Sequence, residues 1–360
     1  MELDEARKNI NKIDKQMAEL FEKRMNCAQE IANYKIKHAM PIFDAARESE
    51  IIDKNSKLIA DDVIREHYVN FLKSTMDISK RYQARLIEGI KVAYSGVEGA
   101  FAHIAAIKMF PNAIFVPYPN FKEAYMATVN GECDTTVLPL ENSFAGDVGV
   151  VMDLMFSGSL FVNQVMELEV VHNLVAKKGT TIEQIKKVTS HVQALSQCAE
   201  YIADKGFETY EATNTAIAAK TVSESKDETI AAIASKETAE LYGLQILESS
   251  INTSKGNTTR FGAFSRCMHT ENKKSKIGEH SIVLFTVKNE AGALAKTLNI
   301  IGNHGFNMRS LRSRPMKTLI WNYYFYVELE GNVNSSGGQN MLEEISNYCD
   351  KLKVVGTYNS

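Results

Sequence analysis

The chain has neither the cysteine pattern of a disulfide scaffold nor the histidine spacing of a metal site. Its five cysteines are odd in number, far apart and without a Cys-x-x-Cys pair: Cys27, Cys133, Cys198, Cys267 and Cys349. That usage is typical of reduced, mostly buried residues in a cytoplasmic protein. The eight histidines include no His-x-x-x-His pair, so we expect no metal ion, and no motif leads us to expect a cofactor.

A basic cluster and a long apolar run are also missing. The net charge is −3 at pH 7, so nucleic acid and an anionic membrane are not expected partners. No apolar run is long enough to span a bilayer, and the N-terminus is acidic and helical in pattern, unlike a signal peptide. With 360 residues, of which 44% are hydrophobic, the chain predicts a globular cytoplasmic protein of two or three domains.

Residues 1–88 have the pattern of an all-helical domain. Apolar residues recur at steps of three and four from Leu3 to Tyr34, which predicts one long amphipathic helix. Two further helices are predicted beyond it: one over residues 44–57, and one that Asp61 or Asp62 caps and that runs towards Glu88, with Gly89 at its end.

From Ile90 onwards, short apolar strands alternate with helices. This pattern predicts an α/β domain over residues 90–268 with mostly parallel strand pairing. The predicted strands are Lys91–Tyr94, Thr136–Leu138, Val188–Ser190, Thr229–Ala234 and Arg260–Phe264, and the predicted helices include Phe121–Val129, Ala194–Asp204 and Ala216–Val222.

Residues 271–279 are polar and lysine-rich and have no apolar period, so we predict a linker there. The region beyond it, residues 280–360, has the element order β-α-β-β-α-β of a small ferredoxin-like domain. Its predicted elements are the strand Ser281–Val287, the helix Ala293–Asn303, the strands Asn307–Leu311 and Asn322–Glu330, the helix Met341–Leu352 and the strand Lys353–Thr357.

One position in the first helix does not fit its apolar stripe. The step after Leu20 falls on Arg24, although Cys27 and Ile31 continue the stripe beyond it. A guanidinium keeps its proton, and burying it unpaired costs a large free energy. We therefore expect an anion against Arg24, either a carboxylate of the protein or a carboxylate of a ligand.

Polar residues on all three predicted helices could converge with Arg24 on one interior pocket. Lys35 lies ~20° from Arg24 around the first helix, so both point the same way. The other residues share helix faces at steps of three or four: Asp44, Arg47 and Glu48 on the second helix, Ser79 and Gln83 on the third. For Asp44, Arg47 and Glu48 taken alone, a solvated face with intrahelical ion pairs is the favoured interpretation.

Arg7 cannot join Arg24 on the same small ligand within one chain. It lies seventeen residues earlier, which is ~25 Å along a straight helix. A long helix of this kind also favours an antiparallel partner helix. If Arg7 belongs to the site, it comes from a second chain, and we infer a homodimer.

The whole segment resembles the all-helical chorismate mutase family. The matching features are Ala6-Arg7-Lys8-Asn9-Ile10, Lys23-Arg24, Lys35, Asp44-Ala45-Ala46-Arg47-Glu48 and Ser79-Lys80-Arg81-Tyr82-Gln83. The resemblance implies that the long helices of two chains cross and that each contributes to both pockets. It also implies residue roles: carboxylate binding by Arg24, by Arg7 of the partner subunit and near Ser79, contact with the ether oxygen by Lys35 and Gln83, contact near the ring hydroxyl by Asp44 and Glu48, and support by Arg47.

Polar motifs flank three strands of the α/β domain, where such sheets place their ligands. They are Leu138-Pro139-Leu140-Glu141-Asn142-Ser143, Ser190-His191-Val192-Gln193 with Gln197 beyond it, and Asn257-Thr258-Thr259-Arg260-Phe261. Each alone is more often a cap or a turn. The turn Tyr94–Ala100 could bind an anion at a helix N-terminus or only reverse the chain, and it is not a dinucleotide motif. No convincing Ser-His-Asp or Cys-His set is present.

These motifs resemble the prephenate dehydratase family over residues 90–268. The resemblance implies two α/β lobes, like those of a periplasmic binding protein, with the site in the cleft between them. Thr259 would be the key catalytic residue, with Asn142, Ser190 and Gln197 beside it. The sequence departs from the family pattern at Val192, where proline is common, and at Ala102, where serine is common.

The last region resembles the ACT family of amino-acid-sensing modules. Gly292, Ala293 and Leu294 match the motif that binds an amino acid in related dehydratases. Ser313, Arg314 and Pro315 match the second motif, although Arg312 stands where an acidic residue is common. The resemblance implies L-phenylalanine as the ligand, and a merely structural small domain is the alternative.

Together these features predict a bifunctional enzyme with an all-helical, a two-lobed α/β and a ferredoxin-like domain. It would turn chorismate into prephenate and then into phenylpyruvate, under feedback control by phenylalanine. A non-catalytic sensor of aromatic ligands is one alternative, but it leaves Arg24, Lys35 and Gln83 without an explanation. An arogenate dehydratase is another, and the motifs do not separate it from the first.

Overall fold

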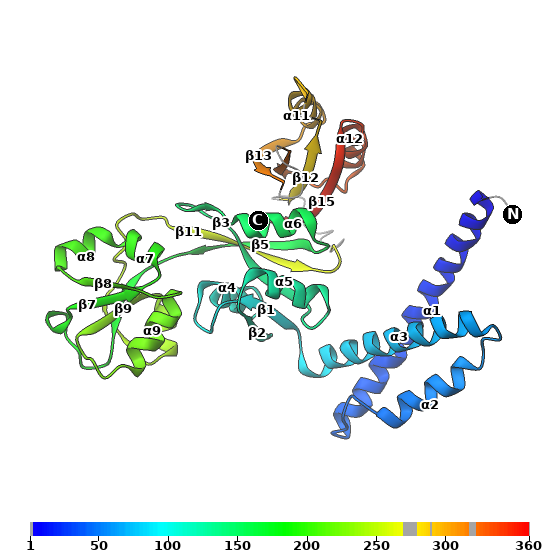
Figure 1. Cartoon of the computed structure of the whole chain (residues 1–360), viewed down its shortest axis with the longest axis horizontal. Helices are drawn as coiled ribbons and strands as arrows, with labels where there is room; N and C mark the ends of the chain where they lie inside the picture. The colour runs from blue at the N-terminus through cyan, green and yellow to red at the C-terminus, as the bar shows by residue number, and fades with distance from the viewer. Residues whose placement is uncertain (1–2, 269–278, 289, 317–321, 360) are drawn as a thin grey trace. The chain divides into compact units, whose positions relative to one another are not determined.

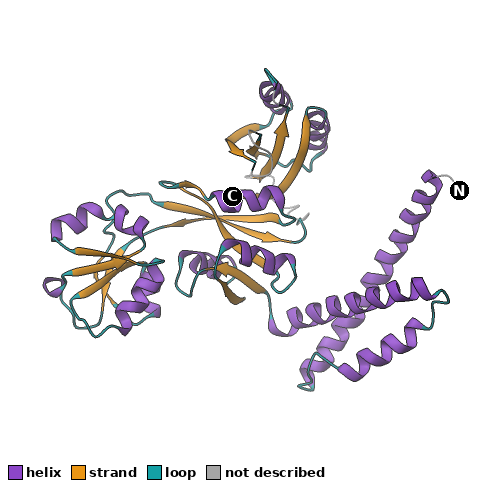
Figure 2. Cartoon of the chain, in the orientation of Figure 1, coloured by secondary structure: helices purple, strands orange, loops and turns teal. Residues whose placement is uncertain are grey.

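A computed structural model describes residues 3–268, 279–288, 290–316 and 322–359 of the chain (Figure 1). The chain forms two compact units, residues 1–90 and residues 91–360, and each is described by itself below. In Figure 2 the first unit is drawn almost entirely as helices, whereas the second contains every strand.

The first unit consists of α1 (Leu3–Lys37), α2 (Ala45–Ser56) and α3 (Asp62–Glu88). The side chains of Asp44 and Asp61 accept hydrogen bonds from backbone N–H groups of the first turns of α2 and α3, which would otherwise lack partners. Gly89 ends α3 with a φ of 101°, a conformation that favours glycine. The three predicted helices and their caps are confirmed.

The face of α1 that packs within the chain is not the predicted apolar stripe. Ala28 and Ala32 are its buried residues, and Arg24 lies one turn before Ala28 on the same line. The large apolar side chains of α1 are exposed: Leu3, Ile10, Ile13, Met17, Leu20, Phe21, Ile31, Tyr34 and Ile36. Small alanines let α3 approach closely, and the larger stripe is left uncovered in a single chain.

The first sheet of the second unit has the strand order β2-β1-β3-β11-β5, with β4 paired to β3. Its strands are β1 (Lys91–Ser95), β2 (Ile114–Tyr118), β3 (Thr135–Asn142), β4 (Gly146–Asp147), β5 (Phe161–Glu169) and β11 (Thr258–Ser265). The helices α4 (Phe101–Met109), α5 (Phe121–Val129) and α6 (Gly149–Ser157) belong to this lobe. Its core includes Leu138, Val162 and Phe264, all fully buried.

The second sheet has the strand order β10-β6-β9-β7-β8. Its strands are β6 (Asn173–Ala176), β7 (Lys187–Ser190), β8 (Glu208–Glu211), β9 (Ile230–Ala234) and β10 (Gln245–Glu248), and its helices are η1 (Ile182–Gln184), α7 (Val192–Gln197), α8 (Ala199–Lys205), α9 (Thr215–Glu224) and α10 (Lys236–Leu241). The chain crosses between the two sheets after β5 and returns before β11. The predicted two-lobed α/β architecture is confirmed.

The predicted mostly parallel pairing is wrong. Only β1–β2, β1–β3, β7–β8 and β7–β9 are parallel among the described pairs of these two sheets, and the other pairs are antiparallel. β11 returns from the second lobe and enters between β3 and β5 in the reverse direction. The predicted helix Ala194–Asp204 is also interrupted at Cys198, which separates α7 from α8.

A third sheet, with the order β13-β14-β12-β15, forms the predicted ferredoxin-like domain. Its elements are β12 (Glu279–Val287), α11 (Ala293–Asn303), β13 (Asn307–Pro315), β14 (Tyr323–Glu330), α12 (Ser336–Ser346) and β15 (Cys349–Asn359). The predicted helix Met341–Leu352 is wrong in position, because Ser335 caps α12 earlier and β15 begins at Cys349. The predicted linker over residues 271–279 lies outside the described residues, apart from Glu279.

Two sequence expectations concern the cysteines and the membrane. Cys133 and Cys198 are buried, but Cys27 and Cys267 are exposed, so the expectation of mostly buried cysteines is wrong. Over the described ranges, no helix combines the length and the apolar character needed to cross a bilayer. No group of side chains suited to hold a metal ion occurs in that part of the chain either.

Candidate active sites

Arg24 is half-buried between α1 and α3, and both groups that it contacts are uncharged. Its Nη1 donates to the backbone oxygen of Thr75 at 3.3 Å and to the hydroxyl of Ser79. Burial lowers the pKa of Arg24, although a guanidinium remains charged at neutral pH. The positive charge of Arg24 is therefore not paired with a carboxylate among the described residues, although burial favours such a pair.

Ser79 and Gln83 share the buried face of α3, one helical turn apart, and each is only 7% exposed. Within the described part of the chain, the Oε1 atom of Gln83 is buried and has no hydrogen-bond partner. A buried acceptor without a partner is costly, so this oxygen marks a place where a donor group of a ligand can complete the hydrogen bonds. Arg24 and Ser79 are thus in contact, and Gln83 lies one turn beyond Ser79 on α3.

The other predicted residues of this unit have partners of their own. Lys35 donates to the backbone oxygen of Ile42 at 2.5 Å. Asp44 caps α2, and the exposed Arg47 pairs with Glu50 at 2.7 Å, as expected for a solvated face. Arg7 is exposed and lies 3.7 Å from Asp4 on its own helix.

Glu48 has a partner that the sequence did not indicate. Its carboxylate lies 2.9 Å from the ammonium of Lys80, which also contacts Asp77. Hydrogen bonds first from Lys80 to Asp77 and then to Glu48 raise the pKa of Lys80. Glu48 is therefore already neutralised in the single chain.

The second candidate site is a cleft of about 340 Å³ between the two lobes of the α/β region. The first lobe contributes Asn142 and Thr259, and the second contributes His172 and Gln197. Asn257, on the segment that returns to the first lobe, also lines the cleft. This position at the boundary of two lobes is a common place for ligands in α/β proteins.

A hydrogen-bonded chain of side chains runs across the cleft. Asn142 Nδ2 lies 2.9 Å from Thr259 Oγ1 and 2.8 Å from Asn257 Oδ1. Asn257 Nδ2 donates to Gln197 Oε1 at 2.9 Å, and the same oxygen lies 2.9 Å from His172 Nε2. These contacts connect Thr259 through Asn142 and Asn257 to Gln197 and His172 of the second lobe.

The contacts of Gln197 fix the tautomer of His172. Because the amide oxygen can only accept, His172 Nε2 carries the proton, and Nδ1 is left as a buried acceptor without a partner. Burial lowers the pKa of His172 against a raising contribution from the Gln197 hydrogen bond, so the ring is neutral at pH 7.

Strand pairing explains why Asn142 and Thr259 meet. Thr259 stands opposite Asn142 in the antiparallel ladder between β11 and β3. The amino end of β11 therefore lies beside the carboxyl end of β3, where the sequence placed the site. Residues 117 positions apart are thereby brought within hydrogen-bond distance.

Ser190 is not in the cleft, unlike the three other predicted dehydratase residues. It is fully buried, and its hydroxyl donates to the backbone oxygen of Ile233 at 2.6 Å. Its neighbour His191 lines the cleft instead. His172 could not be predicted from the sequence, because it follows β5 at the first crossing between the lobes and belongs to no local motif.

The departures at Ala102 and Val192 leave the network in place. Ala102 lines the cleft from α4, and Val192 begins α7 with 53% of its surface exposed. Ser95 and Ala100, at the two ends of the predicted turn, also line the cleft.

The motif residues of the last domain lie at the start of α11 and on β13, at the border with the dehydratase region. Gly292 caps α11 with a φ of 81°, followed by Ala293 and Leu294. Arg314 lies 3.3 Å from Asp153 of α6. Ser313 and Pro315 lie beside it on β13.

Known proteins with matching sequences cover nearly the whole chain. The family model of chorismate mutase type II matches residues 6–84, that of prephenate dehydratase matches residues 92–269, and that of the ACT domain matches residues 281–336. The bifunctional chorismate mutase/prephenate dehydratase of Aquifex aeolicus is 30% identical over 368 residues, covering 99% of this chain and 98% of that protein.

The chain belongs to the bifunctional chorismate mutase/prephenate dehydratase family. It is an enzyme with both of that family's catalytic regions and an ACT domain, as the sequence predicted.

Two solved structures share the fold of the bifunctional family's dehydratase and ACT regions. Prephenate dehydratase from Arthrobacter aurescens in complex with L-Phe has a TM-score of 0.69 at 23% identity, covering 75% of this chain and 90% of that one. A protein described as GqqA, a novel type of quorum quenching acylase, has a TM-score of 0.69 at 28% identity, covering 75% of this chain and 98% of that one.

Proposed function

We propose that residues 1–88 rearrange chorismate to prephenate and that residues 90–268 convert prephenate to phenylpyruvate. In this proposal residues 280–360 form a regulatory domain that binds L-phenylalanine. The observation that supports the first step best is the half-buried Arg24 between neutral neighbours. The protein would work in the cytoplasm, where this biosynthetic chemistry takes place, without a cofactor.

The rearrangement needs positioning and charge rather than a nucleophile. Chorismate is a flexible dianion, and fixed cations can hold it in the reactive conformation. Arg24, supported by Ser79, binds one carboxylate, and Arg7 of the partner subunit binds the other. Lys35 and Gln83 donate to the ether oxygen on which negative charge develops, and preorganised donors of this kind stabilise the transition state. Asp44 and Glu48 lie towards the ring hydroxyl, with Arg47 in support.

A homodimer completes this site because Arg7 cannot reach it within one chain. The exposed stripe on α1 contains large apolar residues such as Ile13 and Leu20, which are 52% and 63% exposed. A contiguous apolar surface of this kind marks an interface. Pairing of two α1 helices would cover the stripe and deliver Arg7 of the partner subunit to the pocket.

Thr259 supplies the hydrogen bond for the dehydration step. Asn142 donates to Thr259 Oγ1, so the threonine's own hydrogen is free to point at the leaving hydroxyl of prephenate. The bond to the carboxylate carbon breaks, its electron pair enters the ring, and the hydroxyl leaves with the C–O electron pair as hydroxide, which the hydrogen bond from Thr259 stabilises and which takes up a proton from solvent after release. Carbon dioxide is released, and the gain in aromaticity means that a neutral donor suffices in a site shielded from water.

Asn142 and Gln197 hold this arrangement across the cleft. Ser190 acts indirectly, because its hydroxyl donates to the backbone oxygen of Ile233 and so fixes β7 to β9. His172 is added to the proposed site because it lines the cleft and its buried Nδ1 has no hydrogen-bond partner among the described residues.

L-phenylalanine would bind at Gly292, Ala293, Leu294, Ser313, Arg314 and Pro315. Support comes from the matching ACT family model and from the Arthrobacter aurescens protein, which was solved with L-Phe. The contact between Arg314 and Asp153 gives the effector region a direct connection to α6. Equilibrium dialysis with phenylalanine tests this, and the absence of saturable binding would contradict it.

One incubation tests both catalytic steps. Purified protein given chorismate should accumulate prephenate and then phenylpyruvate, and phenylalanine should slow the second product. A protein that binds these ligands but turns over neither one would be a sensor. Faster turnover of arogenate than of prephenate would instead identify an arogenate dehydratase.

A further inference from the structure

Strand β11 presents different residues to its two sides. Thr259 and Phe261 line the cleft between the lobes. Thr258 and Arg260 line a separate cavity of about 640 Å³ together with Glu141 and other charged residues. Because successive side chains of a strand point to opposite faces, the proposed catalytic residue and Arg260 are neighbours that look in opposite directions.

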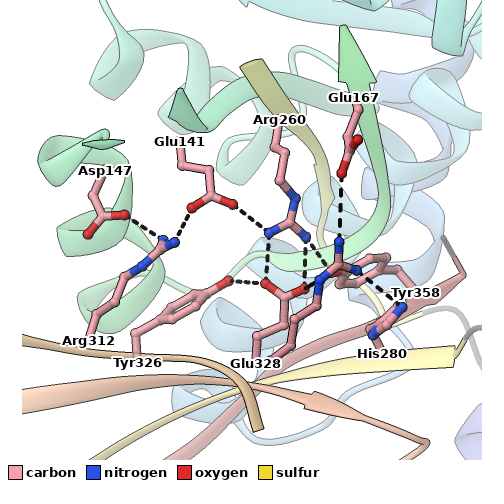
Figure 3. Close-up of polar contacts among 10 residues, drawn as sticks. Glu141, Asp147, Glu167, Arg260, His280, Arg312, Tyr326, Glu328 and Tyr358 are labelled. Carbon is pink, nitrogen blue, oxygen red and sulfur yellow. Dashed lines mark hydrogen bonds and ion pairs between the residues drawn. The ribbon is translucent and has the colours of Figure 1, made fainter. Parts of the chain in front are cut away.

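Arg260 reaches from β11 to the ACT sheet (Figure 3). Its Nη1 and Nη2 lie 2.9 Å and 2.8 Å from the two carboxylate oxygens of Glu328 on β14. Nη2 also donates to the hydroxyl of Tyr358 on β15 at 2.6 Å, and Nη1 lies 2.7 Å from Glu141 on β3. One guanidinium thus joins the strand of Thr259, the strand of Asn142 and the ACT domain.

The surroundings of this guanidinium are built to hold it in one place. Glu328 has a side chain with 0% exposure and also accepts from the hydroxyl of Tyr326 at 3.2 Å. Arg312 bridges Glu141 and Asp147 on the other side (Figure 3). A planar guanidinium bound to both oxygens of a carboxylate fixes direction as well as distance.

The backbone ladder holds β11 regularly against β5 around Thr259, but its pairing with β3 is irregular there. Arg260 stands opposite Glu141 and Thr259 stands opposite Asn142, but the register between β11 and β3 shifts immediately beyond Arg260. Phe261 then stands opposite Pro139, which has no N–H to donate. The side-chain contacts of Arg260 therefore anchor the strand at the point where its pairing becomes irregular.

From these contacts we propose that Arg260 is a positioning residue for dehydration, which holds Thr259 and Asn142 in place by anchoring β11 and β3 to Glu328 and Tyr358 of the ACT sheet. Arg260 does not touch the substrate in this arrangement. The inference rests on the proposed dehydratase function and assigns that step a structural support outside the cleft.

Kinetics of the full-length enzyme with prephenate test this proposal. Arg260→Gln should lower kcat about 100-fold, the scale expected when a reacting group is misplaced by about an ångström, while KM changes by no more than about twofold. Glu328→Gln, on the ACT side of the contact, should give the same division between kcat and KM. The mutase activity of the same chain should be unchanged in both variants.

Two further variants separate positioning from general disruption. Tyr358→Phe removes only the hydroxyl that contacts Arg260 and Glu328, so it should fold normally and still lower kcat. Lys351→Met is the matched control, because it removes the hydrogen bond from Lys351 to the backbone oxygen of Phe156 on α6 across the same domain border without touching β3 or β11. It should leave kcat for prephenate unchanged.

The outcomes distinguish this inference from the proposed function. Normal kcat in folded Arg260→Gln and Tyr358→Phe would overturn the inference, as would a rise in KM alone, which would place Arg260 on the substrate. A wild-type enzyme that does not consume prephenate would instead overturn the proposed function. Loss of kcat in Tyr358→Phe with normal kcat in Lys351→Met supports the inference.

Discussion

Arg24 is partly buried and Arg260 more deeply so, but their charges are compensated in different ways. Arg260 lies between Glu141 and Glu328, and its pKa is raised despite burial because these carboxylates bind it. Among the described residues, Arg24 contacts only a hydroxyl and a backbone oxygen, and burial lowers its pKa. The charge of Arg260 is compensated by carboxylates of the protein itself, whereas Arg24 is suited to receive a carboxylate from outside.

Replacement of Arg24 by alanine should therefore stop the mutase step and spare the dehydratase step. We expect kcat/KM for chorismate to fall by about 10²–10³, the scale for losing one preorganised charged donor. Turnover of added prephenate should stay at the wild-type rate. Lys57→Ala is the control, since Lys57 forms an exposed ion pair with Asp53 at 2.8 Å, and such pairs contribute little. Equal loss in both variants would refute the assignment.

Thr259 offers a comparison at nearly constant volume. Thr259→Val removes the hydroxyl and should lower kcat for prephenate by about 10²–10³, because the leaving group loses its hydrogen-bond donor. Thr259→Ser keeps the donor and should retain most of the activity. Both variants should rearrange chorismate normally, as followed by the appearance of prephenate. A valine variant that still dehydrates prephenate would show that another group supplies this hydrogen bond.

Helix α1 shows at the scale of an element what a single sequence can and cannot reveal. The helix and the caps at Asp44 and Asp61 were predictable because they depend on residues within one turn. The buried face was not, because the periodicity of α1 is satisfied by Ala28 and Ala32 towards α3 and by larger residues towards solvent. An apolar stripe predicts that a surface is buried in the native assembly, but it does not tell whether the same chain or a second chain buries it.

Strand β11 shows the same limit for the cleft. The motif around Thr259 was visible in the sequence. The antiparallel insertion of β11 between β3 and β5 was not, because those strands precede the whole second lobe in the chain. Ser190 was expected in the cleft because it ends a strand, yet its side chain points to Ile233. His172 was missed because only the folded chain brings it to Gln197.

The exposed stripe of α1 predicts an effect of assembly on catalysis. Leu20→Glu places a charge in the proposed interface, so it should shift the dimer towards monomer and lower mutase activity at low protein concentration. Sedimentation velocity and the chorismate assay would be compared over the same concentrations. Met126→Glu on α5, where the side chain is 39% exposed, is the control and should do neither. A monomeric variant with full mutase activity would exclude a role for Arg7 of the partner subunit.

Across the whole molecule, buried histidines and buried carboxylates make stability depend on pH in the same direction. Burial lowers the pKa of His103, His172 and His280 below the ordinary value of 6.5. Burial alone would raise the pKa of Glu141 and of Glu328. Hydrogen bonds, those from Arg260 foremost, instead hold each pKa below its ordinary value. Each group is thus less readily protonated in the folded chain than in the unfolded chain.

The free energy of unfolding should therefore fall as the pH drops from 7. Below about 6.5 the unfolded chain takes up protons at histidines that the folded chain leaves neutral, and each unit of lowered pKa contributes about 1.4 kcal/mol. Below about 4.5 the carboxylates add to the loss, which is complete only below their folded pKa. Urea unfolding between pH 7.5 and about 5 would measure the first window. His172→Gln should give a shallower slope there than the wild type, and an unchanged slope would show that folding does not lower the pKa of His172.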